Sequence, residues 1–197
     1  MRVCFFGRSA LRFKQEIAAR GWLQHPFMVP REYRAWLANQ GSLTHRLRQC
    51  CQDFSVRPVR VGPMRPNRDE IALLQLPAHE IAYIREVVLN CQGQAVVFAH
   101  SVVAARSMRG PWAAVARLGS RPLGEALFGN PRIVRGCLQY RRINARHALV
   151  RQARLADLPM PHKALWARRS LFTLHGHPLM VTEVFLPAIL DIRENKK

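Results

Sequence analysis

The sequence lacks long apolar stretches. Across its 197 residues, no apolar run approaches the ~18 residues that a helix needs to cross a bilayer. The apolar stretch at residues 3–6 is too short for the core of a signal peptide, and the basic N-terminal region lacks the serine richness of a transit peptide. We therefore assign no targeting segment and expect a soluble protein with no transmembrane segment.

Cysteine is also scarce, with five residues and no C-x-x-C motif. An odd number of cysteines at these spacings indicates neither a disulfide framework nor a set of zinc ligands. We therefore expect a cytoplasmic protein, kept in a reducing compartment, without a metal site.

Acidic residues are the third shortage, because 12 Asp and Glu stand against 31 Lys and Arg, a formal net charge of +19. Such a charge favours anionic partners. The basic residues are nearly all arginine and are scattered singly or in pairs, without an arginine-rich helix or the aromatic–basic repeat of an RNA-binding sheet. A nucleic-acid-binding protein is supported by nothing except the charge, so we expect no specific nucleic-acid partner. The positive electrostatic field could instead steer a small dicarboxylate into a cleft, or cause weak nonspecific binding to acidic polymers.

The composition that remains is that of a globular protein. Hydrophobic residues make up 49% of the chain, enough for one good core at this length. We find no internal repeat and no long linker, and predict a single domain over residues 1–197. Helices are predicted at 31–37, 43–51, 71–76, 111–118 and 144–157, with a further helical turn that follows residues 121–124 and ends at 128. Strands are predicted at 54–61, 80–90, 95–104, 133–143 and in both arms of 165–187. This order predicts the α+β class, a single antiparallel sheet with helices on one face.

The last hairpin, residues 165–187, carries one charge on an otherwise apolar face. It turns at Gly176, which takes positive φ at no steric cost. Side chains alternate along its second arm, so Glu183 shares a face with Val181 and Phe185. A carboxylate buried there needs a partner or a function. The alternatives are a functional residue, or a strand-edge residue that reaches solvent or pairs with an arginine.

The middle hairpin, residues 80–104, shows the same feature with the opposite sign. Alternation places Arg85 on the apolar face of Val87, and a buried guanidinium needs an anion. Its partner could be Glu183, Glu86 or a ligand carboxylate bound through the guanidinium fork. The strand pattern leaves these three open.

A helix beginning at residue 43 follows Ser42, which is suited to the N-cap. The free N–H groups of its first turn could bind an anion. Together with helix 31–37 it could instead form a DNA-reading unit, but nothing else in the sequence supports that reading. We favour the anion.

Four stretches together resemble the chorismate pyruvate-lyases of bacterial ubiquinone biosynthesis. They are WLANQGSLTHRL, YIREVVLNCQGQ, RLGSRPLGEALF and LWARRSLFTLHGHPLMVTEVFLP, which follow the family's order and spacing from about residue 36 to 187. Residues 1–30 lie outside the resemblance. It implies one chorismate lyase-like domain with about six antiparallel strands, helices on one face, and a ligand enclosed under two helical flaps.

The same resemblance implies a substrate-binding site at Leu43, Arg85, Leu123 and Glu183. Arg85 and the backbone amide of Leu43 would hold the ring carboxylate of the substrate. Glu183 and the amide of Leu123 would engage its hydroxyl end. Arg85 and Glu183 would therefore be the catalytic residues.

Two points stay open within this resemblance. The second carboxylate of the substrate needs another cation, for which Arg135, Arg168 and Arg169 are the candidates. Ala99 and His100 stand where the family has a glycine-containing pair, which leaves the geometry of the flaps open.

The activity that the resemblance implies is that of a carbon–oxygen lyase. Chorismate carries an enolpyruvyl ether beside a ring carbon that bears both a hydroxyl and a hydrogen, so loss of pyruvate aromatises the ring to 4-hydroxybenzoate. Such a reaction can depend on positioning and aimed polar groups, and we expect no cofactor. The resemblance implies the first committed step of ubiquinone biosynthesis, and we expect a monomer. We interpret His175 and His177 as turn residues rather than metal ligands.

The main alternative comes from the same fold family. The UTRA domains of transcription regulators are non-catalytic and bind small-molecule effectors. Such a domain would bind its ligand without turnover.

Overall fold

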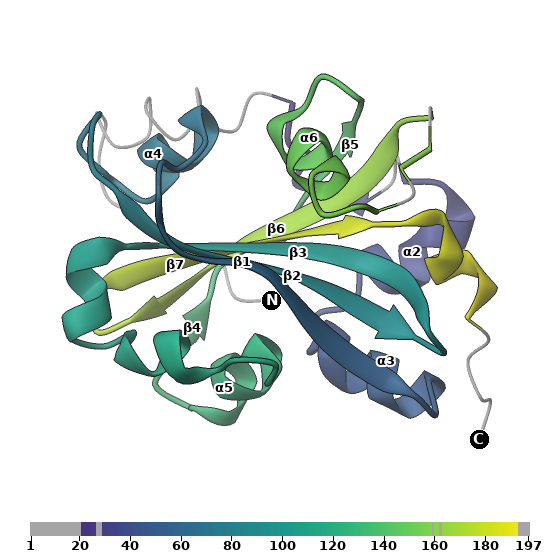
Figure 1. Cartoon of the computed structure of the whole chain (residues 1–197), viewed down its shortest axis with the longest axis horizontal. Helices are drawn as coiled ribbons and strands as arrows, with labels where there is room; N and C mark the ends of the chain where they lie inside the picture. The colour runs from purple at the N-terminus through teal and green to yellow at the C-terminus, as the bar shows by residue number, and fades with distance from the viewer. Residues whose placement is uncertain (1–20, 27–28, 159, 162, 193–197) are drawn as a thin grey trace.

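One antiparallel sheet runs through the molecule in the computed structural model, which describes residues 21–26, 29–158, 160–161 and 163–192 (Figure 1). The strand order is β1-β2-β3-β7-β6-β4, and β5 also pairs with β6. The strands are β1 (Phe54–Met64), β2 (Ala82–Cys91), β3 (Gln94–Ala104), β4 (Val134–Arg135), β5 (Gln139–Ile143), β6 (Leu165–Leu174) and β7 (His177–Phe185). The predicted α+β class with a single antiparallel sheet is confirmed.

The seventh strand arises because the predicted strand 133–143 is broken. Val134 of β4 pairs with Thr173, and Tyr140 of β5 pairs with Arg168, so the register on β6 shifts by one residue between them. Gly136 lies at the break, where its N–H donates to the carbonyl of Leu171 over 2.7 Å. Both pieces remain on β6, and together they act as one interrupted edge strand.

The two faces of the sheet follow the predicted alternation. We call the side of Val181, Glu183 and Phe185 the front face and the side of Met180 and Val184 the rear face. Phe185 packs in one cluster with Trp36 and Leu47 from the helices in front, whereas Val184 and Met180 belong to clusters behind the sheet. Each face therefore has its own apolar core.

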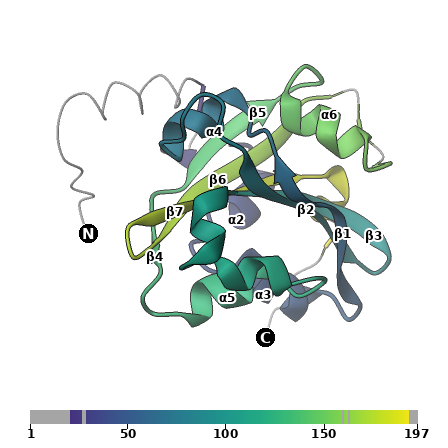
Figure 2. The same ribbon diagram turned by 60° about the vertical axis from the view of Figure 1, so that its left-hand side comes forward.

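Helices cover both faces, as Figures 1 and 2 show. On the front face are α2 (Arg31–Leu37), α3 (Leu43–Cys50) and α5 (Leu123–Gly129), and on the rear face α4 (Arg68–Leu73) and α6 (Ala148–Arg154). The predicted layer of helices on one face is therefore formed by α2, α3 and α5. In addition, α4 and α6 cover the other face. They are required because β7 is apolar on both sides, and an uncovered apolar face would stay in water. Within the described residues, 3₁₀ segments lie at Ala105–Arg109, Ala113–Arg117 and Pro187–Asp191.

No helix in the described ranges is long and apolar enough to span a membrane. The longest of them, α3, has 8 residues, about 12 Å at 1.5 Å per residue.

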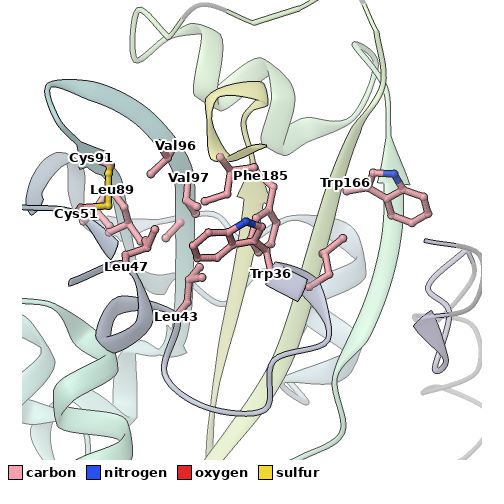
Figure 3. Packing of buried hydrophobic residues seen from close by; sticks show 14 of the residues in the cluster. Trp36, Leu43, Leu47, Cys51, Leu89, Cys91, Val96, Val97, Trp166 and Phe185 are labelled. Atoms are coloured by element: carbon pink, nitrogen blue, oxygen red, sulfur yellow. A yellow bond between two sulfur atoms is a disulfide. The ribbon is translucent and has the colours of Figure 1, made fainter. Parts of the chain in front are cut away.

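The front core fastens α2 and α3 to the middle of the sheet. Trp36, Leu43 and Leu47 pack toward Leu89 and Phe185 (Figure 3). Each of these side chains is less than 6% exposed. The first turn of α3 is thereby held above the front face, next to β2.

A disulfide between Cys51 and Cys91 links the end of α3 to the end of β2 (Figure 3). The expectation that the cysteines form no disulfide is wrong for this pair. The two residues are 40 apart in sequence, and the packing of α3 on β2 brings their Cα atoms within 5.4 Å. Linear spacing does not contain that information, so the cysteine count gives no support to a reducing compartment.

We predict that reduction of this disulfide lowers the free energy of unfolding by about 2–4 kcal/mol, because the bond restricts a long loop in the unfolded chain. Urea unfolding with and without dithiothreitol measures the difference. The double variant Cys51→Ala/Cys91→Ala is the control and should not respond to the reductant. Equal unfolding midpoints for oxidised and reduced wild type would contradict the bond's contribution.

Candidate active site

A pocket lies between the front face of the sheet and the first turns of α3 and α5, which approach each other beneath the sheet in Figure 2. Leu43, Arg85, Leu123 and Glu183 all line it. They come from two helices and two non-adjacent strands, so the fold brings together the four residues selected from the sequence. Their roles in binding and catalysis remain predictions.

Strand register explains the depth of the pocket. Arg85 on β2 lies opposite Ser101 on β3, and Glu183 on β7 lies between Ala99 on β3 and Arg168 on β6. The two β3 side chains are small and line the pocket. The long charged side chains on either side therefore have space above the floor of the sheet.

Arg85 is a buried cation in the wall of this pocket. The residue is 2% exposed, and its Nη2 donates to the carbonyls of Gly119 and Arg121, both over 2.9 Å. Within the described residues, Nε and Nη1 make no hydrogen bond and no carboxylate pairs with the guanidinium. Burial lowers the pKa of Arg85. Two carbonyls solvate part of the charge but do not neutralise it, so the guanidinium of Arg85 has no negative counter-charge among the described residues.

Glu86, one candidate partner of Arg85, points to the rear face. It accepts two hydrogen bonds from Arg60, from Nε over 2.9 Å and from Nη2 over 3.0 Å. His100 lies between Glu86 and Glu70, with Nδ1 3.0 Å from Glu86 Oε1. Its Nε2 is 3.0 Å from Glu70 Oε1, an ion pair without hydrogen-bond geometry. Burial alone would lower the pKa of His100, but the two carboxylates raise it to about 9.

Glu183, the second candidate partner, pairs with Arg168. The Nε of Arg168 donates to Glu183 Oε2. The Nη1 of Arg168 donates to three carbonyls at the end of α2, those of Trp36, Leu37 and Asn39, over 3.0, 3.2 and 2.8 Å. Arg168 is 1% exposed, so its position is fixed. Glu183 therefore pairs with an arginine, as one of the alternatives from the sequence stated. The pair orients the Glu183 carboxylate toward the pocket, which Glu183 lines.

The two helices above the pocket present their N-terminal ends to it. Leu43 and Leu123 are the first residues of α3 and α5, whose leading N–H groups have no partner within the helix. The helices meet at Gly124, where an added Cβ would lie 2.8 Å from Ser42 Oγ and 3.1 Å from Thr44 Oγ1. The absence of a side chain at Gly124 allows both ends to reach the same ligand.

The remaining candidate cations divide between the faces. Arg135 lines the pocket together with Arg168. Arg169 lies on the rear face, where its Nη1 donates to Asp69 over 3.0 Å and its Nε to Gln139 over 2.8 Å. Arg169 is therefore excluded as the cation for the second carboxylate.

The rest of the lining is apolar and includes flat side chains. Val87, Val181, Leu127, Phe128 and Phe172 surround the charged residues. Such walls suit a ring and strengthen the electrostatic interactions of any charge placed among them.

In the described part of the chain, no group of three or more His, Cys, Asp or Glu side chains is arranged to hold a metal ion. His175 lies in the β6–β7 turn with a φ of 50°. The Nδ1 of His177 is 2.9 Å from Ser107 Oγ. Both histidines thus lie at the turn, away from the pocket lining.

The fold and the pocket define the class of protein, an α+β domain with an arginine-lined pocket between one sheet and two helices. The chain is similar in fold to the ligand-binding domain of a putative GntR-family transcriptional regulator from Bordetella bronchiseptica, with a TM-score of 0.50 and 16% identity over 74% of this chain and 90% of that one. It is also similar to the PhnF C-terminal domain, with a TM-score of 0.52 and 12% identity over 66% and 80%. At these identities the likeness shows the fold alone.

The sequence comparisons define the family. A family model described as chorismate lyase matches residues 19–195. A probable chorismate pyruvate-lyase from Thiobacillus denitrificans is 52% identical over 170 residues, which cover 86% of this chain and 90% of that protein. One from Methylobacillus flagellatus is 44% identical over 171 residues, 87% and 95% of the two chains. The chain belongs to the chorismate lyase family, and the match also includes part of the N-terminal segment that lay outside the sequence resemblance.

Two features of the site were not assigned from the sequence. The first is the attachment of Arg168 to the end of α2, which depends on contacts between residues about 130 apart. The second is which of Arg135, Arg168 and Arg169 lies at the pocket. For the two arginines of β6, strand alternation contained this information: Arg168 shares its face with Ser170 and Phe172, whereas Arg169 lies on the other face.

We predict that the stability of the protein falls as pH rises from 6.5 to 9. The folded-state pKa of His100 is about 9, above the ordinary value of 6.5, so its contribution is complete below pH 6.5 and is lost as pH rises through 9. The loss should reach up to about 3 kcal/mol. Urea unfolding across this range measures it, and His100→Gln should show a much flatter profile. Parallel profiles for the two proteins would show that His100 does not titrate in this way.

Proposed function

We propose that the protein is a chorismate pyruvate-lyase that converts chorismate to 4-hydroxybenzoate and pyruvate. The observation that carries the proposal is the buried guanidinium of Arg85, which faces the same pocket as Glu183 without a carboxylate partner among the described residues. The relatives described as probable chorismate pyruvate-lyases support it.

In this proposal Arg85 binds the ring carboxylate of chorismate. Two carbonyls already accept from its Nη2, which leaves Nε and Nη1, on opposite sides of the guanidinium, as separate charge-assisted donors for the carboxylate. The N–H of Leu43 at the start of α3 completes the contact, where the helix dipole also favours an anion.

Glu183 engages the hydroxyl end of the substrate. Arg168 fixes one oxygen of the carboxylate, and the other can accept a hydrogen bond from the ring hydroxyl. The N–H of Leu123 at the start of α5 contacts the same end.

The chemistry then requires little beyond this arrangement. The ether bond between the ring and the enolpyruvyl oxygen breaks, the adjacent ring carbon gives up its hydrogen as a proton, and the departing enol takes up a proton to become pyruvate. Aromatisation of the ring provides the driving force. The residues of the pocket contribute by holding the reactive conformation and by placing fixed charges near the atoms where charge develops.

The wider setting belongs to the proposal as well. A supply of 4-hydroxybenzoate for ubiquinone biosynthesis and a cytoplasmic location follow from the resemblance to the bacterial lyases. The proposal also takes the protein to be a monomer.

The second candidate is a non-catalytic effector-binding domain, favoured by the fold similarity to a regulator's ligand-binding domain. Incubating the purified protein with chorismate, and following 4-hydroxybenzoate and pyruvate together, separates the two. Equimolar appearance of both products supports the lyase. Binding of chorismate without either product would support the effector domain.

We predict that Glu183→Gln lowers kcat by about ten-fold or more, because the neutral amide no longer stabilises charge at the hydroxyl end. The variant should also be less stable, since Arg168 loses its only side-chain carboxylate partner in the described structure. Thermal unfolding monitored by circular dichroism establishes how much of the protein is folded in the assay. Glu125→Gln, which removes an exposed carboxylate of α5, is the matched control and should keep its kcat. A Glu183→Gln protein that is folded and fully active would make Glu183 a structural residue.

A further inference from the structure

Arg135 lines the pocket but has no part in the four-residue site described above. It lies on β4, and its guanidinium lies 5.4 Å from the ring centroids of both Phe128 and Phe172. Its Nε donates to Ser170 Oγ over 2.9 Å and its Nη1 to the carbonyl of Gln40 over 2.6 Å. The side chain is therefore held in place above β6.

No carboxylate pairs with Arg135 among the described residues, and its Nη2 makes no hydrogen bond there. Burial, followed by the charge of Arg168, lowers the pKa of Arg135 to about 10, while Glu183 raises it. The guanidinium thus remains protonated at neutral pH. It is a fixed cation at the pocket with one nitrogen still available to an anion.

The pocket as a whole has the charge of a dicarboxylate site. Arg85, Arg135 and Arg168 line it together with Glu183, a net charge of +2. Arg168 is engaged by Glu183 and by three carbonyls, so Arg85 and Arg135 are the lining arginines whose carboxylate partner is missing from the described structure.

The order of the charged residues across the sheet matches the order of the polar groups on chorismate. Arg85 is on β2, Glu183 on β7 and Arg135 on β4, and the strand order is β2-β3-β7-β6-β4. On chorismate the ring carboxylate lies at one end, the hydroxyl at the opposite carbon, and the enolpyruvyl ether on the carbon beside the hydroxyl. With the ring carboxylate on Arg85 and the hydroxyl on Glu183, the enolpyruvyl group lies toward β4.

We propose that Arg135, positioned by Ser170, binds the carboxylate of the enolpyruvyl group. This assignment rests on the proposed lyase function. The contact holds the leaving group and distinguishes chorismate from a monocarboxylate such as benzoate or the product. Because the enolpyruvyl carboxylate is still present as the ether breaks, the contact acts chiefly on binding.

Equilibrium binding of two unreactive ligands tests the assignment. One is benzoate, and the other is benzoate with an enolpyruvyl ether at its 3-position, which adds the second carboxylate. The wild type should bind the dicarboxylate roughly ten- to a hundred-fold more tightly, the range for one charge-assisted contact. In Arg135→Gln this ratio should fall close to one, while the affinity for benzoate stays within about two-fold.

Arg132→Gln is the matched control, because it removes the same charge from an exposed position three residues away. Its ratio should equal that of the wild type, which separates the direct contact from the general basic field. An unchanged ratio in Arg135→Gln, or an equal loss of affinity for both ligands, would overturn the proposal. If the wild type binds the ligands but does not convert chorismate, the lyase function fails while the ratio still tests the subsite. If it turns over chorismate and the ratio survives in Arg135→Gln, the subsite alone fails.

Discussion

The structure depends on how charges are accommodated on a sheet that is apolar on both faces. A guanidinium or carboxylate in that environment loses hydration and must recover it from protein groups or from a ligand. Glu183, Glu86 and Arg168 recover it within the protein. Arg85 recovers part of it from two carbonyls and is left without a carboxylate partner in the described structure. In the proposed function, the carboxylate of the substrate supplies the missing counter-charge.

The two faces handle charge for different purposes. On the rear face, His100 between Glu70 and Glu86 forms a compact cluster that ties β2, β3 and α4 together. On the front face, Arg168 connects Glu183 to the end of α2, and the Cys51–Cys91 bond holds the end of α3. The ends of α2 and α3, two of the helices in front of the sheet, are thus fixed to its strands. Such rigidity suits a site that works by positioning its ligand.

Local sequence rules predicted much of this arrangement. Alternation identified Arg85 and Glu183 as charges on the front face, because a strand's period of two is a local property. Both hairpins and the starts of α3 and α5 also depend on nearby residues. Long-range features could not be obtained in this way: the Cys51–Cys91 bond, the position of α4 and α6 on the rear face, and the Arg168 contacts depend on how distant segments pack. The break at Gly136 was missed for a related reason, since a bulge depends on pairing with β6.

The central claim is that Arg85 binds the ring carboxylate in substrate and product alike, and Arg85→Ala tests it most directly. Because this carboxylate persists through the reaction, the contact should tighten binding throughout and contribute little to the chemical step. The account predicts that KM for chorismate and the inhibition constant of 4-hydroxybenzoate rise by similar factors, roughly ten- to a hundred-fold. The single-turnover rate at saturating chorismate should fall much less. A collapse of the single-turnover rate with unchanged affinity for 4-hydroxybenzoate would contradict it.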